Sequence, residues 1–274
     1  MNTPKVTVIC LCHNQASFVK DAIYSVLNQT YPTIELIVVD DGSADLSKEI
    51  IRELISASSV KFIDIPHPIG NCKAFNSGLE SATGQYIIDL AADDVLLSNR
   101  VEVGIKTFEE KQIGVEFCNV QHISQDGIPL ASHFSTADTV PEGDLYQKLI
   151  DTYFISPPGM MIKKDVLDQL GGYDENLSYE DFDFWIRSSR EFAYGYTNQI
   201  LVQKRDVANS LSKRQFRFRT THQESTLAVC QKIKHLNRTK LEDAALRRRC
   251  LYEIKNCLKQ GNFSLIPPFL RLCF

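Results

Sequence analysis

Residues 35–43 read ELIVVDDGS, a short apolar run that ends in two carboxylates, a glycine and a serine. A continuous run of leucine, isoleucine and valine is typical of a strand buried on both faces, as in a parallel sheet. Aspartate, glycine and serine are turn residues that stop such a strand. The stretch therefore predicts a buried strand over residues 35–40 whose carboxyl end carries acidic side chains.

The chain on both sides of this strand alternates between strand and helix patterns. Strand patterns cover residues 6–12, 35–40, 61–65 and 86–90, and helical spacing covers residues 17–28, 46–56 and 71–82. Strands that alternate with helices within ninety residues favour a parallel sheet of the Rossmann-like, nucleotide-binding kind.

The alternation of strand and helix patterns is less regular after residue 94. We predict a helix over 101–111, strands over 115–123 and 160–162, a helix over 179–190, and only helices after residue 209. Residues 124–144 are rich in turn-forming side chains and lack periodicity, so we expect a mobile loop over the site there.

Acidic side chains recur where the predicted strands end. Asp40 and Asp41 close one strand, and Asp93 and Asp94 follow another by three residues. The carboxyl ends of parallel strands converge on one crevice, where ligands bind. Adjacent carboxylates are costly there unless they face a cation, and Mg²⁺ or Mn²⁺ prefers such oxygen ligands. The pattern indicates a metal-bound nucleotide, although turn formation and helix capping are simpler explanations of each pair.

Two common nucleotide sites are disfavoured by the loop after the first strand. It reads HNQASF, which contains neither the GxGxxG of dinucleotide enzymes nor a GxxxxGK[ST] phosphate loop. A nucleotidyltransferase would also need a glycine-rich basic loop at this place. Metal and side chains, rather than a glycine cradle, are therefore expected to hold phosphate.

Charge is unevenly distributed along the chain. The net charge of −4 conceals a basic tail, because residues 204–274 contain 16 Lys and Arg against 5 Asp and Glu. A basic tail suggests an anionic partner, either phospholipid headgroups or a phosphate-bearing acceptor, and a solvated helix face is the alternative. Few aromatic residues interleave with these charges, which disfavours nucleic-acid binding.

Cysteine spacing and hydropathy bear on the compartment. The eight cysteines form no CxxC pair, so we expect reduced, mostly buried thiols. No segment has the ~20 apolar residues of a membrane span, and the amino terminus lacks a secretory signal pattern. The expected location is the cytoplasm, with the tail resting peripherally on the inner membrane surface.

Four blocks in order give a resemblance to a known family. VTVICLCHN, AIYSVLNQTYPTIELIVVDDGSAD, IGNCKAFNSGLESATGQYIIDLAADD and GGYDENLSYEDFDFWIR together resemble the family 2 glycosyltransferases with the GT-A fold, from about Val6 to Arg205. The resemblance implies an α/β domain over residues 1–205, with a mainly parallel mixed sheet flanked by helices. A basic helical extension would follow over residues 206–274.

The resemblance also implies roles for single residues. Asp94 is similar to the direct metal ligand, and Asp181, in YEDFDFWIR, to the general base that deprotonates an acceptor hydroxyl. The residues implied to bind the nucleotide are Asp41, which would hold the base, with Leu11, Cys12, Asn14, Lys73 and Asp93. Glu180 and Trp185 would contact the acceptor or the donor sugar; first-turn acids of a helix and a core aromatic are the simpler explanations.

The implied activity is an inverting, metal-dependent transfer. The donor would be a UDP-hexose or UDP-N-acetylhexosamine, and the acceptor a glycan or lipid-linked glycan in cell-surface polysaccharide synthesis. Two departures from the family pattern motivate an alternative, a nucleotide-sugar-binding module with weakened catalysis. Ala91 fills the first position of Asp-x-Asp-Asp, and Val207 stands about where a histidine is common, so Arg205, Lys213 or Arg214 would have to substitute electrostatically.

Overall fold

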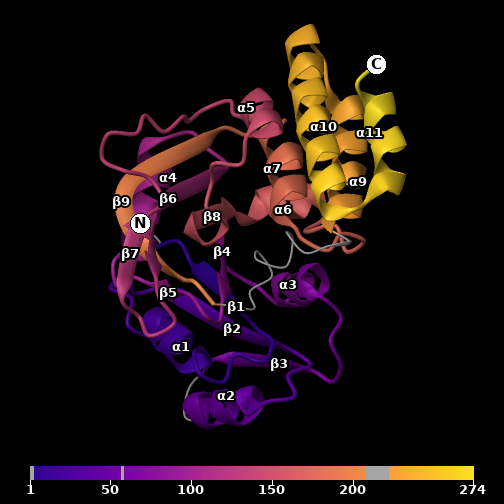
Figure 1. The fold of residues 1–274 in the computed structure, drawn as a ribbon. Helices are drawn as coiled ribbons and strands as arrows, with labels where there is room; N and C mark the ends of the chain where they lie inside the picture. The colour runs from indigo at the N-terminus through magenta and orange to yellow at the C-terminus, as the bar shows by residue number, and fades with distance from the viewer. Residues whose placement is uncertain (1–2, 57–58, 208–221) are drawn as a thin grey trace. The chain divides into compact units, whose positions relative to one another are not determined.

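The computed structural model describes residues 3–56, 59–207 and 222–274 (Figure 1). Contacts divide the chain into two compact units that interleave along the sequence. Unit 1 contains the chain up to Gly143, Ile155–Tyr173 and Ala193–Val207, and unit 2 contains Asp144–Phe154, Asp174–Phe192 and the rest of the chain. The domain boundary predicted between residues 205 and 206 remains a prediction.

Unit 1 is built on a mixed sheet, which in the described part of the chain has nine strands in the order β3-β2-β1-β4-β8-β6-β9-β5, with β7 paired to β6. Their bounds are β1 Val6–Cys12, β2 Ile34–Asp41, β3 Lys61–Ile65, β4 Tyr86–Ala91, β5 Val95–Leu96, β6 Val115–Ile123, β7 Pro129–Ser132, β8 Met160–Lys163 and β9 Tyr194–Arg205. The first four strands are mutually parallel, whereas β8 runs antiparallel to β4 and β6. The predicted α/β fold with a mainly parallel first half is confirmed.

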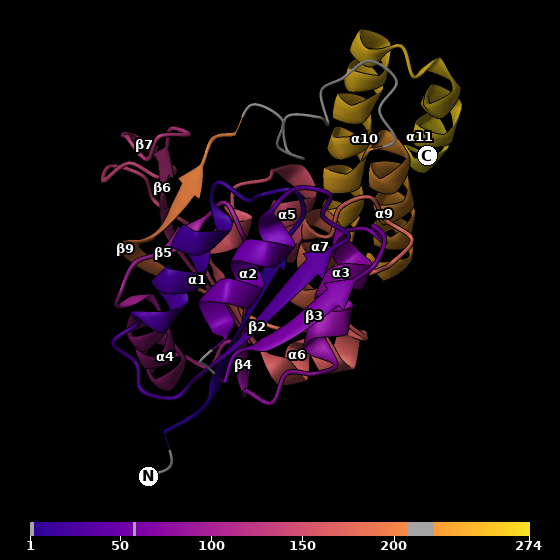
Figure 2. The same ribbon diagram turned by 90° about the horizontal axis from the view of Figure 1, so that it is seen from below.

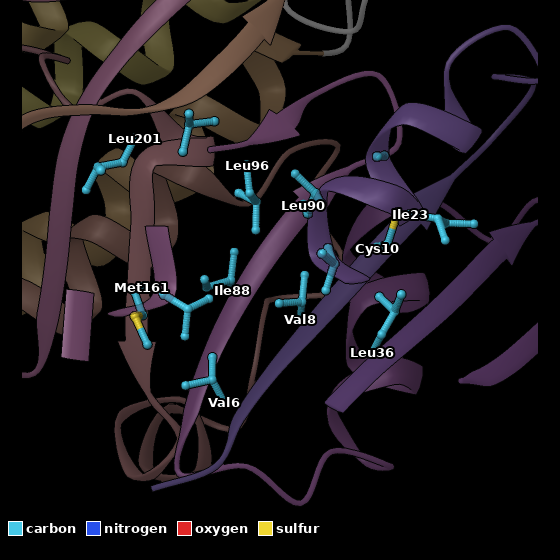
Figure 3. Close-up of a cluster of buried hydrophobic side chains, with 14 of the residues drawn as sticks. Val6, Val8, Cys10, Ile23, Leu36, Ile88, Leu90, Leu96, Met161 and Leu201 are labelled. Carbon is cyan, nitrogen blue, oxygen red and sulfur yellow. The ribbon is translucent and has the colours of Figure 1, made fainter. Parts of the chain in front are cut away.

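Helices cover both faces of this sheet. They are α1 Val19–Leu27, α2 Ser47–Ile55, α3 Asn71–Leu79, α4 Arg100–Glu110, the short α6 Lys164–Leu170 and the 3-10 turn η1 Pro157–Gly159. Apolar side chains of α1, α2 and α4 pack on one face, against alternate residues of β1, β2 and β4 (Figure 3). Figure 2 turns this face, with α1 and α2, toward the viewer.

Helix α3 packs on the opposite face through a glycine. A Cβ at Gly78 would lie 2.6 Å from Ile9 Cγ2 and 3.2 Å from Val39 Cγ2. Both methyl groups belong to fully buried β-branched side chains that cannot swing away. The helix therefore approaches β1 and β2 more closely than any side chain at position 78 would allow.

We expect Gly78→Ala to lower the free energy of unfolding by about 1–3 kcal/mol, because overpacking outweighs the helix preference of alanine, about 1 kcal/mol. Urea unfolding checks this, with Ser77→Ala on the same helix as the control. A Gly78→Ala protein as stable as the parent would contradict the close packing of α3.

Several elements were not predicted. The loop expected over residues 124–144 contains β7, which pairs with β6 at Gln121 and Ser132. The pattern also gave no sign of β9, whose register against β6 shifts near Asn119 and whose middle carries exposed polar residues. A strand with bulges and mixed polarity lacks the period of two on which a sequence prediction depends.

Unit 2 is helical. It contains α5 Tyr146–Asp151, α7 Asp181–Ser189, α9 His222–Leu236, α10 Lys240–Gln260, the 3-10 turn η2 Phe263–Leu265 and α11 Ile266–Leu272. Helix α10 begins with a capping box between Thr239 and Glu242 and ends at Gly261 in the left-handed conformation. The prediction of helices near the end of the chain is confirmed for the described residues.

The core of unit 2 is partly polar. Arg249 is 3% exposed, and its guanidinium lies 4.0 Å from the Tyr153 ring centroid and 5.2 Å from that of Phe182. Its Nε donates to the Ile150 carbonyl at 2.8 Å, and its Nη1 lies 3.3 Å from Glu253 Oε1. One arginine thus joins α5, α7 and α10.

None of the eight cysteines forms a disulfide bond, and seven of them are buried. Among the described residues no helix combines the length and the apolar character needed to cross a bilayer.

Candidate functional site

The carboxyl ends of three neighbouring strands meet at one edge of the sheet in unit 1. Cys12, the last residue of β1, is in register with Asp40 of β2, and Leu11 is in register with Ala91 of β4. A tight turn follows β4, closed by a hydrogen bond of 3.0 Å from the Asp94 amide to the Ala91 carbonyl. This register brings the two predicted acidic pairs to the same edge.

The Asp93–Asp94 turn carries an uncompensated pair of carboxyl groups. Asp94 is 4% exposed, and its Oδ1 accepts one hydrogen bond, of 2.9 Å, from the Arg205 amide. Burial and the neighbouring Asp93 raise the pKa of Asp94 to about 8, and burial raises the pKa of Asp93 as well. The positive charges of Lys204 and Arg205 offset this only in part. These two cations therefore do not fully compensate the two carboxyl groups.

Arg205 fastens the acidic turn to the surrounding loops. Its Nε donates to the Asp93 carbonyl at 3.0 Å and its Nη1 to the Gln125 carbonyl at 2.9 Å. The guanidinium lies 4.9 Å from the Phe18 ring centroid and pairs with Asp21 at 3.3 Å. These contacts use one N–H of each guanidinium nitrogen, so Arg205 is fixed beside the carboxylates by the protein itself.

The other residues predicted to replace the histidine that is absent near position 207 remain sequence predictions. The Val207 amide donates to the Arg205 carbonyl at 3.1 Å, directly after β9. Lys213 and Arg214 lie outside the described residues.

The Asp41 carboxylate binds two backbone amides. Oδ1 accepts from the Ile69 amide at 2.7 Å and Oδ2 from the Gly70 amide at 3.0 Å, just before α3. The Asp41 carbonyl lies 2.6 Å from His13 Nδ1. A carboxylate oxygen has room for a second donor, so the predicted contact with a nucleotide base is compatible with this arrangement.

Asn14 connects the loops after β1 and β2. It is the one described residue other than glycine with a positive φ, 54°. Its amide donates to Ser43 Oγ at 2.8 Å, and its Oδ1 accepts from the Ala44 amide at 2.7 Å. The left-handed conformation and these bonds fix the loop that leaves the first strand.

Leu11 and Cys12 lie at the strand end that the sequence analysis assigned to the nucleotide pocket. Their side chains are 9% and 1% exposed. Burial raises the pKa of the Cys12 thiol to about 12, so it remains protonated at neutral pH. A nucleotide at this edge would therefore meet mainly the backbone of these two residues.

Lys73 is exposed in the first turn of α3. This turn follows Gly70, whose amide the Asp41 carboxylate holds at 3.0 Å. Lys73 and Asp41 thus belong to one local structure, as expected for residues that share a ligand.

The remaining predicted site residues belong to unit 2. Glu180 is the residue that precedes α7, and Asp181 is the first residue of the helix. Trp185 is 3% exposed, with its ring centroid 5.9 Å from that of Tyr153. The burial favours a place for Trp185 in the core of unit 2 over contact with a sugar.

The structure distinguishes the two aspartates of the YEDFDFWIR block. Asp183 is 1% exposed, and its carboxylate accepts from Arg187 Nε at 2.6 Å and from Lys232 Nζ at 2.5 Å. Both oxygens of the Asp183 carboxylate are thus occupied by cationic side chains of unit 2. The role of Asp181 as general base stays a prediction.

One pairing between two of the blocks was missed by the sequence analysis. Asn76 of α3 donates through Nδ2 to the Tyr173 carbonyl and accepts at Oδ1 from the Tyr173 amide, both at 2.9 Å. The Phe75 and Tyr173 rings stack with centroids 4.1 Å apart. The GNCKAFNSG and GGYDE blocks thus bind each other, a contact between residues 97 positions apart that no local pattern reveals.

The Asp93–Asp94 turn fits a divalent cation that obtains its other ligands elsewhere. Among the described residues no group of three or more His, Cys, Asp and Glu side chains could hold a metal ion. Mg²⁺ and Mn²⁺ sites of nucleotide enzymes commonly use one or two carboxylates together with substrate phosphates and water. This turn, in which Asp94 is buried and Asp93 is half-buried, is compatible with that donor set, and the assignment of Asp94 as the metal ligand stays a prediction.

Two hollows of unit 1 lie away from these carboxylates. One, of about 510 Å³, is lined by residues near the amino end of the sheet such as Lys5, Tyr31 and Glu35. The other, of about 410 Å³, is lined by residues that include Asp21, Leu96 and Arg205. Neither is lined by Asp41, Asp93 or Asp94, so the candidate site is defined by its side chains rather than by a cavity.

Residues 7–171, which include the whole carboxyl edge described above, match the model of Glycosyl transferase family 2. The chain belongs to this family. The acidic edge is therefore part of a glycosyltransferase domain, and the resemblance seen in the four sequence blocks is confirmed.

Relatives of this family 2 glycosyltransferase occur in bacteria and archaea. The putative teichuronic acid biosynthesis glycosyltransferase TuaG of Bacillus subtilis is 26% identical over 78% of the chain and 84% of its own length. An uncharacterized glycosyltransferase of Methanocaldococcus jannaschii is 30% identical over 75% of the chain and 72% of its own length. A Rickettsia bellii relative is 31% identical over 72% of the chain, but the match spans only 28% of that protein.

Solved structures share the GT-A fold. Staphylococcus aureus TarS 1–349 in complex with UDP-GlcNAc has a TM-score of 0.75 at 16% identity, over 98% of this chain and 79% of that one. The mannosyltransferase PcManGT of Pyrobaculum calidifontis, in complex with GDP-Man and Mn²⁺, has a TM-score of 0.69 at 15% identity, over 99% and 74% of the two chains.

The metal-free glycosyltransferase should lose stability as the pH rises from about 4 to 8. The unfolded chain releases the Asp94 proton near its usual pKa of about 4, whereas the folded protein retains it until about pH 8. Asp94→Asn keeps the acceptor for the Arg205 amide and removes this ionisation, so its stability should depend less on pH over this window.

Urea unfolding in chelator at pH 5, 6.5 and 8 measures the effect, with the exposed Glu80→Gln as the control. Equal pH slopes in the Asp94→Asn and parent proteins would contradict the assignment of the raised pKa to Asp94.

Proposed function

We propose that this protein transfers a hexose or N-acetylhexosamine from UDP to a hydroxyl group of a glycan or lipid-linked glycan, with inversion at the anomeric carbon and with Mn²⁺ or Mg²⁺ as cofactor. The observation that carries the proposal is the Asp93–Asp94 turn, in which Asp94 is buried and Asp93 is half-buried, at the strand edge that also bears Asp41. A carboxyl pair short of positive charge beside a nucleotide edge suits a metal–diphosphate complex.

The proposed reaction is a single displacement. The acceptor hydroxyl oxygen attacks the anomeric carbon of the sugar, the bond from that carbon to the diphosphate oxygen breaks, and UDP leaves with the bonding electron pair. Asp181 accepts the hydroxyl proton, because a neutral hydroxyl is a weak nucleophile. The metal ion supplies stabilisation of the negative charge on the departing diphosphate. One attack from the face opposite the leaving group inverts the anomeric centre.

The choice of donor and acceptor rests on the neighbours. TarS binds UDP-GlcNAc with the same fold, which supports a UDP-sugar, while the GDP-Man complex of PcManGT shows that the fold also accepts another nucleotide. The name of TuaG connects a relative that matches over most of its length with a cell-wall polysaccharide. We accordingly place the chain in cell-surface polysaccharide synthesis.

A nucleotide-sugar-binding module is the second candidate. Ala91 removes one carboxylate from the common acidic motif, and the described residues contain no group of three potential ligands. Such a module would bind UDP and metal at the same edge and would not turn over.

Asp181→Asn separates the two candidates. The variant should lose transfer activity by about 100-fold or more, because an amide cannot accept the hydroxyl proton. UDP binding should be unchanged, because the predicted nucleotide-binding residues all belong to unit 1.

Transfer is measured with radiolabelled UDP-sugars and UDP affinity by calorimetry in Mn²⁺, with the exposed Glu175→Gln in the same segment as the control. Tight UDP binding without measurable transfer in the parent protein would favour the binding module.

The helices of unit 2 also support the predicted membrane contact. From Ala244 to Phe274 the exposed charged side chains are all basic, namely Arg247, Arg248, Lys255, Lys259 and Arg271. Glu253 is the one acid in this range, and it is 5% exposed. The same range exposes the apolar side chains of Leu251, Tyr252, Leu258, Phe263, Leu270 and Phe274. Exposed apolar and basic residues without acids are typical of helices that lie on an anionic bilayer.

Lys255→Glu/Lys259→Glu should reduce binding to vesicles that contain phosphatidylglycerol roughly tenfold or more, since each basic residue near such a surface contributes about 1 kcal/mol. Co-sedimentation at low and high salt measures the bound fraction, and Lys20→Glu, an exposed reversal in α1, is the control. Equal binding of the parent protein to neutral and anionic vesicles would refute the membrane contact.

A further inference from the structure

The segment that leads into Asp181 is held by hydroxyl groups of α9. Ser178 is bonded twice to Ser225, since its amide donates to Ser225 Oγ at 2.9 Å and the two hydroxyl oxygens are also 2.9 Å apart. The next residue, Tyr179, has its phenol oxygen 2.6 Å from Thr226 Oγ1. Backbone and side chain are thus both fixed within three residues of Asp181.

A ring contact adds to these hydrogen bonds. The Tyr179 and His222 rings stack with centroids 4.8 Å apart and planes at 9° to each other. His222 is the first residue of α9, and Thr226 lies one turn further along the helix. The Tyr179 side chain therefore contacts two successive turns of α9, His222 through its ring and Thr226 through its hydroxyl group.

Lys232, two turns further along α9, holds both flanks of the segment. Its Nζ lies 2.5 Å from Asp174 Oδ2 and 2.5 Å from Asp183 Oδ1. Asp174 precedes the segment, and Asp183 follows Asp181 within α7. One ammonium group therefore fixes the distance between the start of the segment and the helix that carries the base.

The residue types on this face of α9 are unusual for a helix that packs in a core. Ser225 and Thr226 are 7% and 6% exposed, and hydroxyl residues are weak helix formers whose burial costs free energy unless they are hydrogen-bonded. Apolar side chains of similar size would stabilise α9 at least as well. The hydroxyl side chains of Ser225 and Thr226 are explained by the segment that they orient, because a hydrogen bond fixes direction as well as distance.

We propose that Ser225, Thr226 and Lys232 of α9 are positioning residues for the general base Asp181. The inference rests on the proposed role of Asp181. A base must be held within a fraction of an ångström of its working position, and a misplacement of about 1 Å costs about 100-fold in rate.

The test compares Ser225→Ala and Lys232→Met with Lys232→Arg as the conservative variant. The expected result is a kcat lower by 10- to 100-fold with unchanged affinity for UDP and Mn²⁺, and recovery of most of the rate in Lys232→Arg. Lys234→Met, at an exposed position of the same helix, should match the parent protein. If Lys232→Met does not fold because it strands two carboxylates, Ser225→Ala, which removes a single hydroxyl, decides the matter.

A cycle with Asp181→Asn shows whether α9 acts through the base. Once the base is gone its position is irrelevant, so Ser225→Ala should cause no further loss in the Asp181→Asn background. Equal losses in both backgrounds, or no loss in the parent background, would overturn the proposal.

Hydrogen exchange separates failure of this proposal from failure of the proposed function. Ser225→Ala should speed exchange in peptides that cover residues 174–183 and leave peptides of β1 and β2 unchanged. If Asp181→Asn retains full activity, the base assignment is wrong, and faster exchange still shows that α9 orders the segment. Unchanged exchange together with unchanged kcat would exclude any positioning role of Ser225.

Discussion

The hydrogen bond from the Arg205 amide to Asp94 is the contact on which the carboxyl edge of unit 1 depends. It joins the turn after β4 to the end of β9, which are separated by 111 positions in the sequence. A buried carboxylate with one backbone donor is held in place but remains short of positive charge. A cation that binds there completes an arrangement already fixed by the fold. The Arg205 side chain adds a second contact to the same turn, because its Nε donates to the Asp93 carbonyl.

The first half of the fold follows closely from local sequence signals. The runs that form β1, β2 and β4 are largely apolar, and short polar loops separate them from amphipathic helices. The general rule that parallel strands end at one edge was then enough to place Asp41 near Asp93 and Asp94. Here local pattern and global topology agree, as expected of a strongly specified nucleotide-binding half.

The later strands and the individual contacts of the site residues could not be predicted from local sequence patterns. Strand β9 mixes polar and apolar residues across a register shift, so no period identifies it. The two amides bound by Asp41 and the pairing of Asn76 with Tyr173 depend on loops that are distant in sequence. The two aspartates of YEDFDFWIR cannot be told apart by residue type, and the contacts of Asp183 with Arg187 and Lys232 depend on packing that the sequence does not show.

The two units also bear on how the protein is synthesised, because the chain passes from one to the other five times. The sheet of unit 1 lacks β9 until Arg205 has left the ribosome, and β5 and much of β6 have no partner in β9 before then. Helices α5 and α7 in turn emerge long before α9 and α10, against which they pack. Both units are therefore completed only after their last segments, which begin at residues 193 and 208, have been made. Neither can be removed by a single cut without leaving the other with unpaired strands or bare helix faces.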